Sequence, residues 1–261
     1  MSIKQRFDLV IFDWAGTMVD FGCEAPVKAL IEAFDAEGVR LDAATARRDM
    51  GKAKIDHVRA LLAEPQVAAA WQARHGRKAD DSAADLIMTR LRAPMREHAA
   101  RASTLIPGAR ECFERLRAAG LRVASSTGYT HEMMEPVLAR AAEQGYSPEH
   151  LVCSGDTPVG RPSPLMIYKA CAELAVWPLS RVVKVDDAEV GIAEGKAAGA
   201  FTVGVASGNL IGLSLEAFRA LAAAERETRL RSAKDALLAA GADLAIDSVA
   251  DLVPALESVS A

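Results

Sequence analysis

The 261-residue sequence has little of several features that mark particular classes of protein. Only 5% of its residues are aromatic and its net charge is −4, so it lacks the basic field and the stacking side chains of a nucleic-acid binder. No apolar run approaches the ~18 residues of a transmembrane helix, and the N-terminus lacks the apolar region of a signal peptide. The four cysteines are scattered and form no CxxC pair, as is typical of reduced thiols. We therefore expect a cytoplasmic protein that binds neither nucleic acid nor membrane.

The hydrophobic residues, 51% of the chain, are enough for a sizeable core. Short apolar runs that end abruptly in polar residues predict buried strands at residues 7–12, 121–124, 181–185, 201–206 and 244–246. Helical stretches lie between them, for example at residues 109–119 and 189–198, and glycines follow both. This alternation predicts an α/β fold with a doubly wound, Rossmann-like parallel sheet.

Residues 22–101 break the alternation, because they contain helical patterns and no convincing strand. Roughly 80 residues is far too long for an ordinary connection between a strand and a helix. We therefore expect a helical cap domain at residues 22–101, inserted into an α/β core made of residues 1–21 and 102–261. Within the cap, helices are expected at residues 26–37, 45–63, 67–74 and 83–100.

Polar residues follow three of the predicted strands, where ligands bind in open α/β sheets. Asp13, before a glycine-containing turn, is equally compatible with a carboxylate nucleophile and with a simple Asx turn. Asp186 and Asp187 could join it in holding Mg²⁺, or could cap a helix. Thr127 could donate hydrogen bonds to a phosphate, and Arg161 could supply a balancing positive charge or lie exposed in its loop.

This order of residues resembles the haloacid dehalogenase superfamily of phosphotransferases, whose members form an aspartyl phosphate on the first aspartate in the presence of Mg²⁺. Most phosphatases among them carry a second aspartate two residues later, as the general acid for an alcohol leaving group. Ala15 stands at that position here, which disfavours an ordinary phosphomonoesterase. Many members of the superfamily also have Gly-Asp-Thr where this chain has residues 186–188, and a further aspartate where Gly191 stands. The role of Asp186 and the completion of the metal shell are therefore open.

Lys54 offers another way to stabilise a leaving group. If residues 48–58 are helical, Lys54 shares a helix face with Met50 and His57. A desolvated lysine can lose its proton and form a Schiff base with an aldehyde. The protonated imine is an electron sink, which cleavage of a carbon–phosphorus bond requires.

Longer motifs are similar to those of the phosphonatases, a family of phosphonoacetaldehyde hydrolases. The similar segments are residues 13–17, 19–23, 50–61, 126–130, 132–134, 160–162 and 184–187, and the resemblance runs from residue 7 to about residue 212. It implies an Mg²⁺-dependent hydrolase of phosphonate catabolism that splits phosphonoacetaldehyde into acetaldehyde and phosphate. Two alternatives stay open: another phosphatase of this fold, and a catalytically silent phosphate-binding protein.

The same resemblance implies a role for each site residue. Asp13 would be the nucleophile toward phosphorus and Lys54 the Schiff-base lysine. The other implied roles are Mg²⁺ binding by Asp13, the Ala15 carbonyl and Asp187; phosphonate binding by Thr127, Gly128 and Arg161; and a supporting shell around the imine made of His57, Cys23, Met50 and Tyr129. A homodimer formed through the cap is implied as well.

Overall fold

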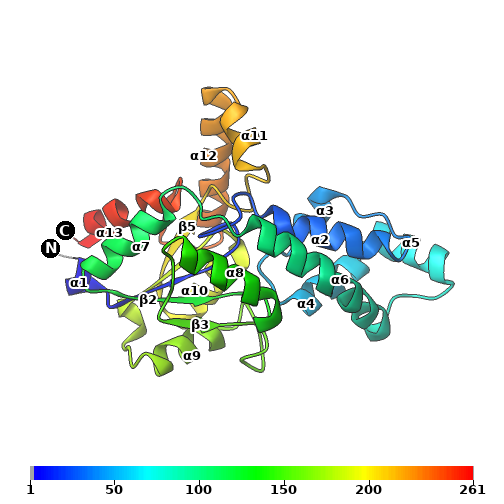
Figure 1. Ribbon diagram of the computed structural model, residues 1–261, viewed down its shortest axis with the longest axis horizontal. Helices are drawn as coiled ribbons and strands as arrows, with labels where there is room; N and C mark the ends of the chain where they lie inside the picture. Colours follow the sequence, from blue (N-terminus) through cyan, green and yellow to red (C-terminus); the bar gives the residue numbers. More distant parts are fainter. Residues whose placement is uncertain (1–2, 261) are drawn as a thin grey trace.

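The computed structural model describes residues 3–260 and is built around a six-stranded sheet (Figure 1). The strands are β1 (Leu9–Phe12), β2 (Arg122–Ser126), β3 (His150–Val152), β4 (Val182–Asp186), β5 (Phe201–Val205) and β6 (Leu244–Ile246). All neighbouring strands pair in parallel, in the order β3-β2-β1-β4-β5-β6. This is a doubly wound sheet, so the predicted Rossmann-like α/β class is confirmed.

Successive residues of the central strand β1 pack on opposite faces of the sheet. Val10 and Phe12 belong to the same hydrophobic cluster as α7, α8 and α13, whereas Leu9 and Ile11 pack with α9. Burial on both faces explains why β1 is apolar throughout rather than alternating. The helices outside the inserted segment are α1 (Ile3–Arg6), α7 (Ala109–Ala118), α8 (His131–Glu143), α9 (Leu165–Glu173), α10 (Glu189–Ala198), α11 (Leu215–Ala220), α12 (Ala223–Ala239) and α13 (Leu252–Ser260).

Most of the chain between β1 and β2, residues 24–102, forms a helical group to one side of the sheet (Figure 1). Its helices are α2 (Glu24–Asp35), α3 (Ala43–Arg47), α4 (Lys54–Ala63), α5 (Pro65–His75) and α6 (Asp81–Ala102). Helices α2 and α6 pack against each other, and α6 also contacts α8 of the core. We call this group the cap; the domain bounds at residues 22–101 stay a prediction.

The expected single helix over residues 45–63 is wrong. Helix α3 ends at Arg47 and α4 begins at Lys54, with turns between them. Within these turns Asp49 and Gly51 have φ angles of 59° and 91°, which a right-handed helix excludes. Met50 therefore does not share a helix face with Lys54, although it reaches the same site from the turn. The expectation for His57 holds, because Lys54 and His57 both lie on α4.

Strand β3, an edge strand of three residues, was not predicted from the sequence. All four cysteines are free and buried, as expected for reduced thiols. Among residues 3–260, no helix combines the length and the apolar character needed to cross a membrane.

Candidate active site

The predicted polar residues meet in one buried site at the carboxyl ends of β1, β2 and β4. Asp13 follows β1, Thr127 follows β2 and Asp187 follows β4, and none of the three is more than 7% exposed. They meet because β1 pairs directly with both other strands. One carboxylate oxygen from each of Asp13, Asp186 and Asp187 lies within 4.8 Å of the other two.

The carboxylate of Asp187 is held in a narrow cradle. Thr17 Oγ1 donates a hydrogen bond to Oδ1 at 2.8 Å, and the Asn209 amide donates to Oδ2 at 2.6 Å. A Cβ atom at Gly16 or at Gly208 would overlap this carboxylate, so only glycine fits at either position. Thr17 and Asn209 were not identified from the sequence as site residues, because their role depends on a contact between distant loops.

Arg161 lies behind Asp13, and its side chain is completely buried. Its Nη1 donates to Asp13 Oδ1 at 2.9 Å, and its Nη2 donates to the carbonyl and the hydroxyl of Ser126 at 2.7 and 3.0 Å. Its Nε pairs with Glu194 Oε2 at 2.9 Å. The guanidinium thus fixes the orientation of the Asp13 carboxylate. Arg161 does not line the cavity described below, so its contact with a phosphonate stays a prediction.

Two buried residues that the sequence analysis did not identify complete this group of charges. Lys184 comes from the middle of β4 and Glu194 from α10, and the side chains of both are inaccessible to solvent. Lys184 Nζ lies 2.9 Å from Ser126 Oγ, 3.0 Å from Asp186 Oδ2 and 3.4 Å from Glu194 Oε2. A lysine within an apolar strand run carries no local signal of this role.

When ionised, the buried carboxyl groups of the site carry more negative charge than the neighbouring buried cations balance. Burial and the charge of Asp186 raise the pKa of Asp13 to about 6, against the opposing effect of Arg161 and Lys184. Burial, with the charges of Asp13 and Asp186, raises the pKa of Asp187 well above its usual value. The buried group contains four carboxylates and two cations: Asp13, Asp186, Asp187 and Glu194 with Arg161 and Lys184. One divalent cation would balance it, and oxygen ligands suit Mg²⁺.

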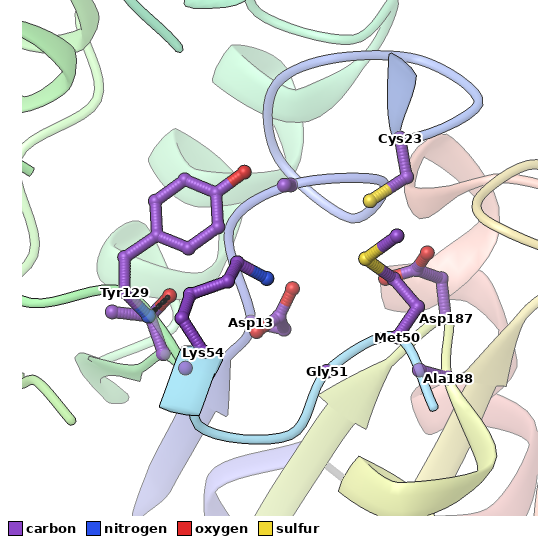
Figure 2. A pocket seen from close by; sticks show the side chains of 11 residues that line it. Asp13, Cys23, Met50, Gly51, Lys54, Tyr129, Asp187 and Ala188 are labelled. Atoms are coloured by element: carbon purple, nitrogen blue, oxygen red, sulfur yellow. Dashed lines mark hydrogen bonds between the residues drawn. The ribbon is translucent and has the colours of Figure 1, made fainter. Parts of the chain in front are cut away.

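A cavity with about 310 Å³ of empty space, part of it open to solvent, lies between these strand ends and the cap (Figure 2). Both the core and the cap contribute side chains to its wall. The lining residues are Asp13, Ala15, Cys23, Met50, Gly51, Lys54, Thr127, Gly128, Tyr129, Asp187 and Ala188. Nine of the predicted site residues are thus brought together around one space, and His57 and Arg161 lie behind its wall.

Lys54 is the first residue of α4 and directs its amine into the cavity toward Asp13 (Figure 2). Its Nζ lies 5.1 Å from the centre of the Tyr129 ring. Only 3% of the residue is exposed, and within residues 3–260 its amine forms no ion pair with a carboxylate. Burial lowers the pKa of Lys54, although the charge of Asp13 partly opposes the shift. The neutral amine, which is the nucleophilic form, is therefore accessible.

The remaining supporting residues surround this amine in uncharged forms. Cys23 and Met50 place their sulfur atoms across the cavity from Tyr129 (Figure 2). Burial raises the pKa of Cys23 and of Tyr129 well above their usual values. Burial and the nearby charge of Lys54 lower the pKa of His57 to about 3, so its ring is neutral. His57 does not line the cavity, and its predicted part in proton handling stays a prediction.

The turn between α3 and α4 lies directly on the core at Gly128. A Cβ at Gly128 would come within 2.6 Å of the Lys52 carbonyl oxygen and 3.0 Å of that of Gly51. A Cβ at Gly51 would come within 2.7 Å of Val190 and 3.2 Å of Ala188. The absence of side chains at both glycines therefore allows the segment that precedes Lys54 to pack on the strand ends.

The chain is similar to proteins of known family over nearly its whole length. Residues 7–199 match the model of the haloacid dehalogenase-like hydrolase family. The chain is 45% identical to the phosphonoacetaldehyde hydrolase of Paraburkholderia phytofirmans, covering 97% of this chain and 95% of that protein. It is 37% identical to the Bacillus cereus enzyme of the same name, covering 97% of each. The crystal structure of a phosphonoacetaldehyde hydrolase-like protein from Oleispira antarctica matches with a TM-score of 0.96 and 39% identity, over 97% of this chain and 92% of that one.

Proposed function

The chain belongs to the phosphonoacetaldehyde hydrolases of the haloacid dehalogenase-like hydrolase family, and we propose that it cleaves phosphonoacetaldehyde to acetaldehyde and phosphate through Lys54 and Asp13. The observation that carries this proposal is the position of both side chains in one cavity (Figure 2). The substrate has two electrophilic atoms, the aldehyde carbon and the phosphorus, and the cavity offers one nucleophile for each.

The first step takes place at Lys54. Its neutral amine adds to the aldehyde carbon, and loss of water with uptake of one proton from solvent leaves a protonated imine between Nζ and the substrate. The face of the Tyr129 ring, 5.1 Å from Nζ, stabilises the positive charge that results. The imine prepares the adjacent carbon to accept the electron pair of the carbon–phosphorus bond.

The second step takes place at Asp13. A carboxylate oxygen attacks phosphorus, the carbon–phosphorus bond breaks, and its electron pair moves into an enamine on Lys54. Arg161, held at 2.9 Å from Oδ1, keeps the carboxylate oriented and ionised for this attack. The enamine is then protonated on carbon, and water releases acetaldehyde from Lys54 and phosphate from the aspartyl phosphate.

The carboxyl cluster fits a divalent metal, because it is buried, supplies only oxygen ligands and carries two uncompensated negative charges. We infer that Asp13, Asp187 and the carbonyl oxygen of Ala15 would hold Mg²⁺. When bound, Mg²⁺ supplies positive charge beside the phosphoryl oxygens. Thr127 and Gly128, which line the cavity beside Asp13, would bind the remaining phosphonate oxygens.

The same family membership supports three further proposals, on the domain division, the oligomeric state and the location of the protein. We propose that residues 22–101 act as a cap on a core of residues 1–21 and 102–261, that the chain forms a homodimer through the cap, and that it acts in the cytoplasm on a small phosphonate. Sedimentation equilibrium tests the dimer, and the mass of a single chain at micromolar concentration would contradict it.

Reductive trapping tests the proposed mechanism. Borohydride added during turnover of phosphonoacetaldehyde reduces the imine to a stable secondary amine, and peptide mass mapping locates it. We expect the modification on Lys54 and none on Lys52, the matched control two residues away, which pairs with Asp49 outside the cavity. Full turnover with an unmodified Lys54 would contradict the mechanism.

A further inference from the structure

A second group of potential metal ligands lies at the edge of the sheet and shares no residue with the carboxyl cluster of the active site. It consists of His131, the first residue of α8, and of Cys153 and Asp156, which follow the edge strand β3. One ring nitrogen, the sulfur and one carboxylate oxygen lie within 4.8 Å of one another. Of the two such groups found among residues 3–260, this is the one that offers sulfur and nitrogen as well as oxygen.

We propose that His131, Cys153 and Asp156 form a binding site for Zn²⁺, with water as the fourth ligand. Imidazole and thiolate are ligands that Zn²⁺ prefers, whereas Mg²⁺ binds oxygen ligands. The thiolate and the carboxylate together balance the two positive charges of the ion. The inference goes beyond the proposed function, because none of the three residues lines the cavity that contains Lys54.

The turn after β3 fixes two of the three ligands relative to each other. The Cys153 amide donates a hydrogen bond to Asp156 Oδ2 at 2.8 Å, and the Asp156 amide donates to the Cys153 carbonyl at 3.1 Å. The Ser154 amide in this turn donates to the carbonyl of Tyr129 at 2.9 Å, two residues before His131. Backbone hydrogen bonds therefore bring the three ligands together in the absence of a metal.

The spacing of the side chains is close to that of a tetrahedral Zn²⁺ site. Bonds of about 2.0–2.2 Å to nitrogen and oxygen and about 2.3 Å to sulfur place neighbouring ligand atoms about 3.3–3.7 Å apart. His131 Nε2 lies 2.9 and 3.1 Å from the two carboxylate oxygens of Asp156, so a small rotation of the ring would admit the ion. The His131 side chain is 65% exposed, which leaves the ring room to turn and gives the ion a path from solvent.

Cys153 distinguishes this group from an ordinary surface ion pair. His98 and Glu32 form a similar contact at 2.7 Å, but among the described residues no cysteine joins them in a group of ligands. Burial and the charge of Asp156 raise the pKa of Cys153 to about 12, so its thiol is protonated at neutral pH in the metal-free chain. Binding of Zn²⁺ would release this proton to solvent and form the bond to the thiolate.

Titration with Co²⁺ in place of Zn²⁺ tests the site, because a bond between Co²⁺ and a thiolate gives a charge-transfer absorption band in the near ultraviolet. Excess Mg²⁺ is present to compete for the carboxyl cluster. We expect the band to saturate at one Co²⁺ per chain and to disappear when Zn²⁺ is added. Cys153→Ser should abolish the band. His131→Ala should weaken Co²⁺ binding by at least about tenfold, since even the loss of a group behind the ligands costs that much.

Three matched variants show whether the band belongs to this site. His98→Ala removes the exposed histidine that pairs with Glu32, and Cys112→Ser removes a different buried thiol. Cys23→Ser removes the thiol that lines the cavity with Asp187. All three should keep the band and the Co²⁺ affinity of the unaltered chain.

Three outcomes would overturn the proposal: no band with the unaltered chain, a band that survives Cys153→Ser, or equal Co²⁺ affinity in His131→Ala and the unaltered chain. Because His131 is exposed, its variant keeps the test valid even if Cys153→Ser lowers the yield of folded protein.

A failure of the proposed function would look different. Mn²⁺, which prefers oxygen ligands, is followed by the electron paramagnetic resonance of the free ion and should bind the carboxyl cluster equally in His131→Ala and the unaltered chain. Phosphate release from phosphonoacetaldehyde should also be equal in these two chains. Its absence from both would contradict the proposed function, while the Co²⁺ band would still report on the zinc site.

Discussion

The core and the cap hold their reactive side chains in opposite ways. Asp13, in the core, lies beside the buried cation Arg161 at 2.9 Å, within a network of charged partners. Lys54, in the cap, is buried with an aromatic ring at 5.1 Å and, among residues 3–260, no carboxylate in an ion pair. In the proposed mechanism the carboxylate must stay ionised to attack phosphorus, so it needs positive charges beside it. The amine must lose its proton to attack carbon, so it needs surroundings without carboxylates.

The difference shows how one cavity can hold an ionised carboxylate and a neutral amine. Burial acts on both, raising the pKa of Asp13 and lowering that of Lys54. Arg161 and Lys184 oppose the shift at Asp13, and the charge of Asp13 partly opposes the shift at Lys54, but no carboxylate in the described chain forms an ion pair with the cap amine. The charged partners therefore belong to the core, and the cap places the uncharged side chains of Cys23 and Met50 at the cavity beside Lys54.

The largest expected effect comes from removing either nucleophile. Asp13→Asn and Lys54→Met should each lower phosphate release by about 10⁴-fold or more, because each removes a covalent intermediate. The two losses should differ in kind. Asp13→Asn should still form an imine at Lys54, detected by borohydride trapping, whereas Lys54→Met should lose the imine and still bind Mn²⁺. Imine trapping that depends on Asp13 would contradict the division between core and cap.

A second prediction concerns the charged partners in the core. Arg161→Lys should lower kcat about 10²-fold, because an ammonium cannot reproduce contacts to Asp13, Ser126 and Glu194 that a planar guanidinium makes at once. Steady-state kinetics with phosphonoacetaldehyde measures the loss. Arg229→Lys, in an exposed pair with Glu225, is the control and should be unchanged. A full rate with lysine at position 161 would show that the positive charge alone is enough.

The sequence predicted the α/β core more accurately than the cap. Apolar runs predicted the strands β1, β2 and β4 and placed Asp13, Thr127 and Asp187 at their ends, because the pattern of a buried strand is local in the sequence. The turn before Lys54 was predicted as helix, since the φ angles of Asp49 and Gly51 depend on packing against the core.

The buried charges near Arg161 were not predicted for a related reason. Glu194 of α10 pairs with both Arg161 and Lys184 of β4, and no spacing along the chain indicates such contacts. Their role depends on three segments that are brought together only in the fold. For Lys54 the likeness to phosphonatase motifs identified the residue, while its separation from carboxylates became visible only in the structure.

A third, smaller effect is expected where the cap touches the core. Gly128→Ala places a methyl group 2.6 Å from the Lys52 carbonyl oxygen and must displace the turn before Lys54. We expect kcat to fall about tenfold, because small displacements of reacting groups are costly, and amide exchange in residues 48–53 to become faster. Gly160→Ala is the matched control, since its methyl would meet only the Ala53 side chain at 3.4 Å. Equal effects of both variants would contradict a specific contact at Gly128.

The smallest expected effect is on stability, and it tests the absence of charged partners around Lys54. The pKa of Lys54 is lowered in the folded protein, so burying this residue costs free energy wherever the unfolded chain carries the lysine as an ammonium. Lys54→Met, of similar size, removes that cost and should raise the melting temperature near pH 7 by roughly 2–4 °C. The gain should shrink as pH rises toward about 10.4, where the unfolded lysine also loses its proton.

Lys28→Met, on the exposed face of α2, is the control and should change little. A lower melting temperature for Lys54→Met at neutral pH would mean that the cap lysine is stabilised by its surroundings, as Asp13 is by Arg161, and the contrast between cap and core would fail.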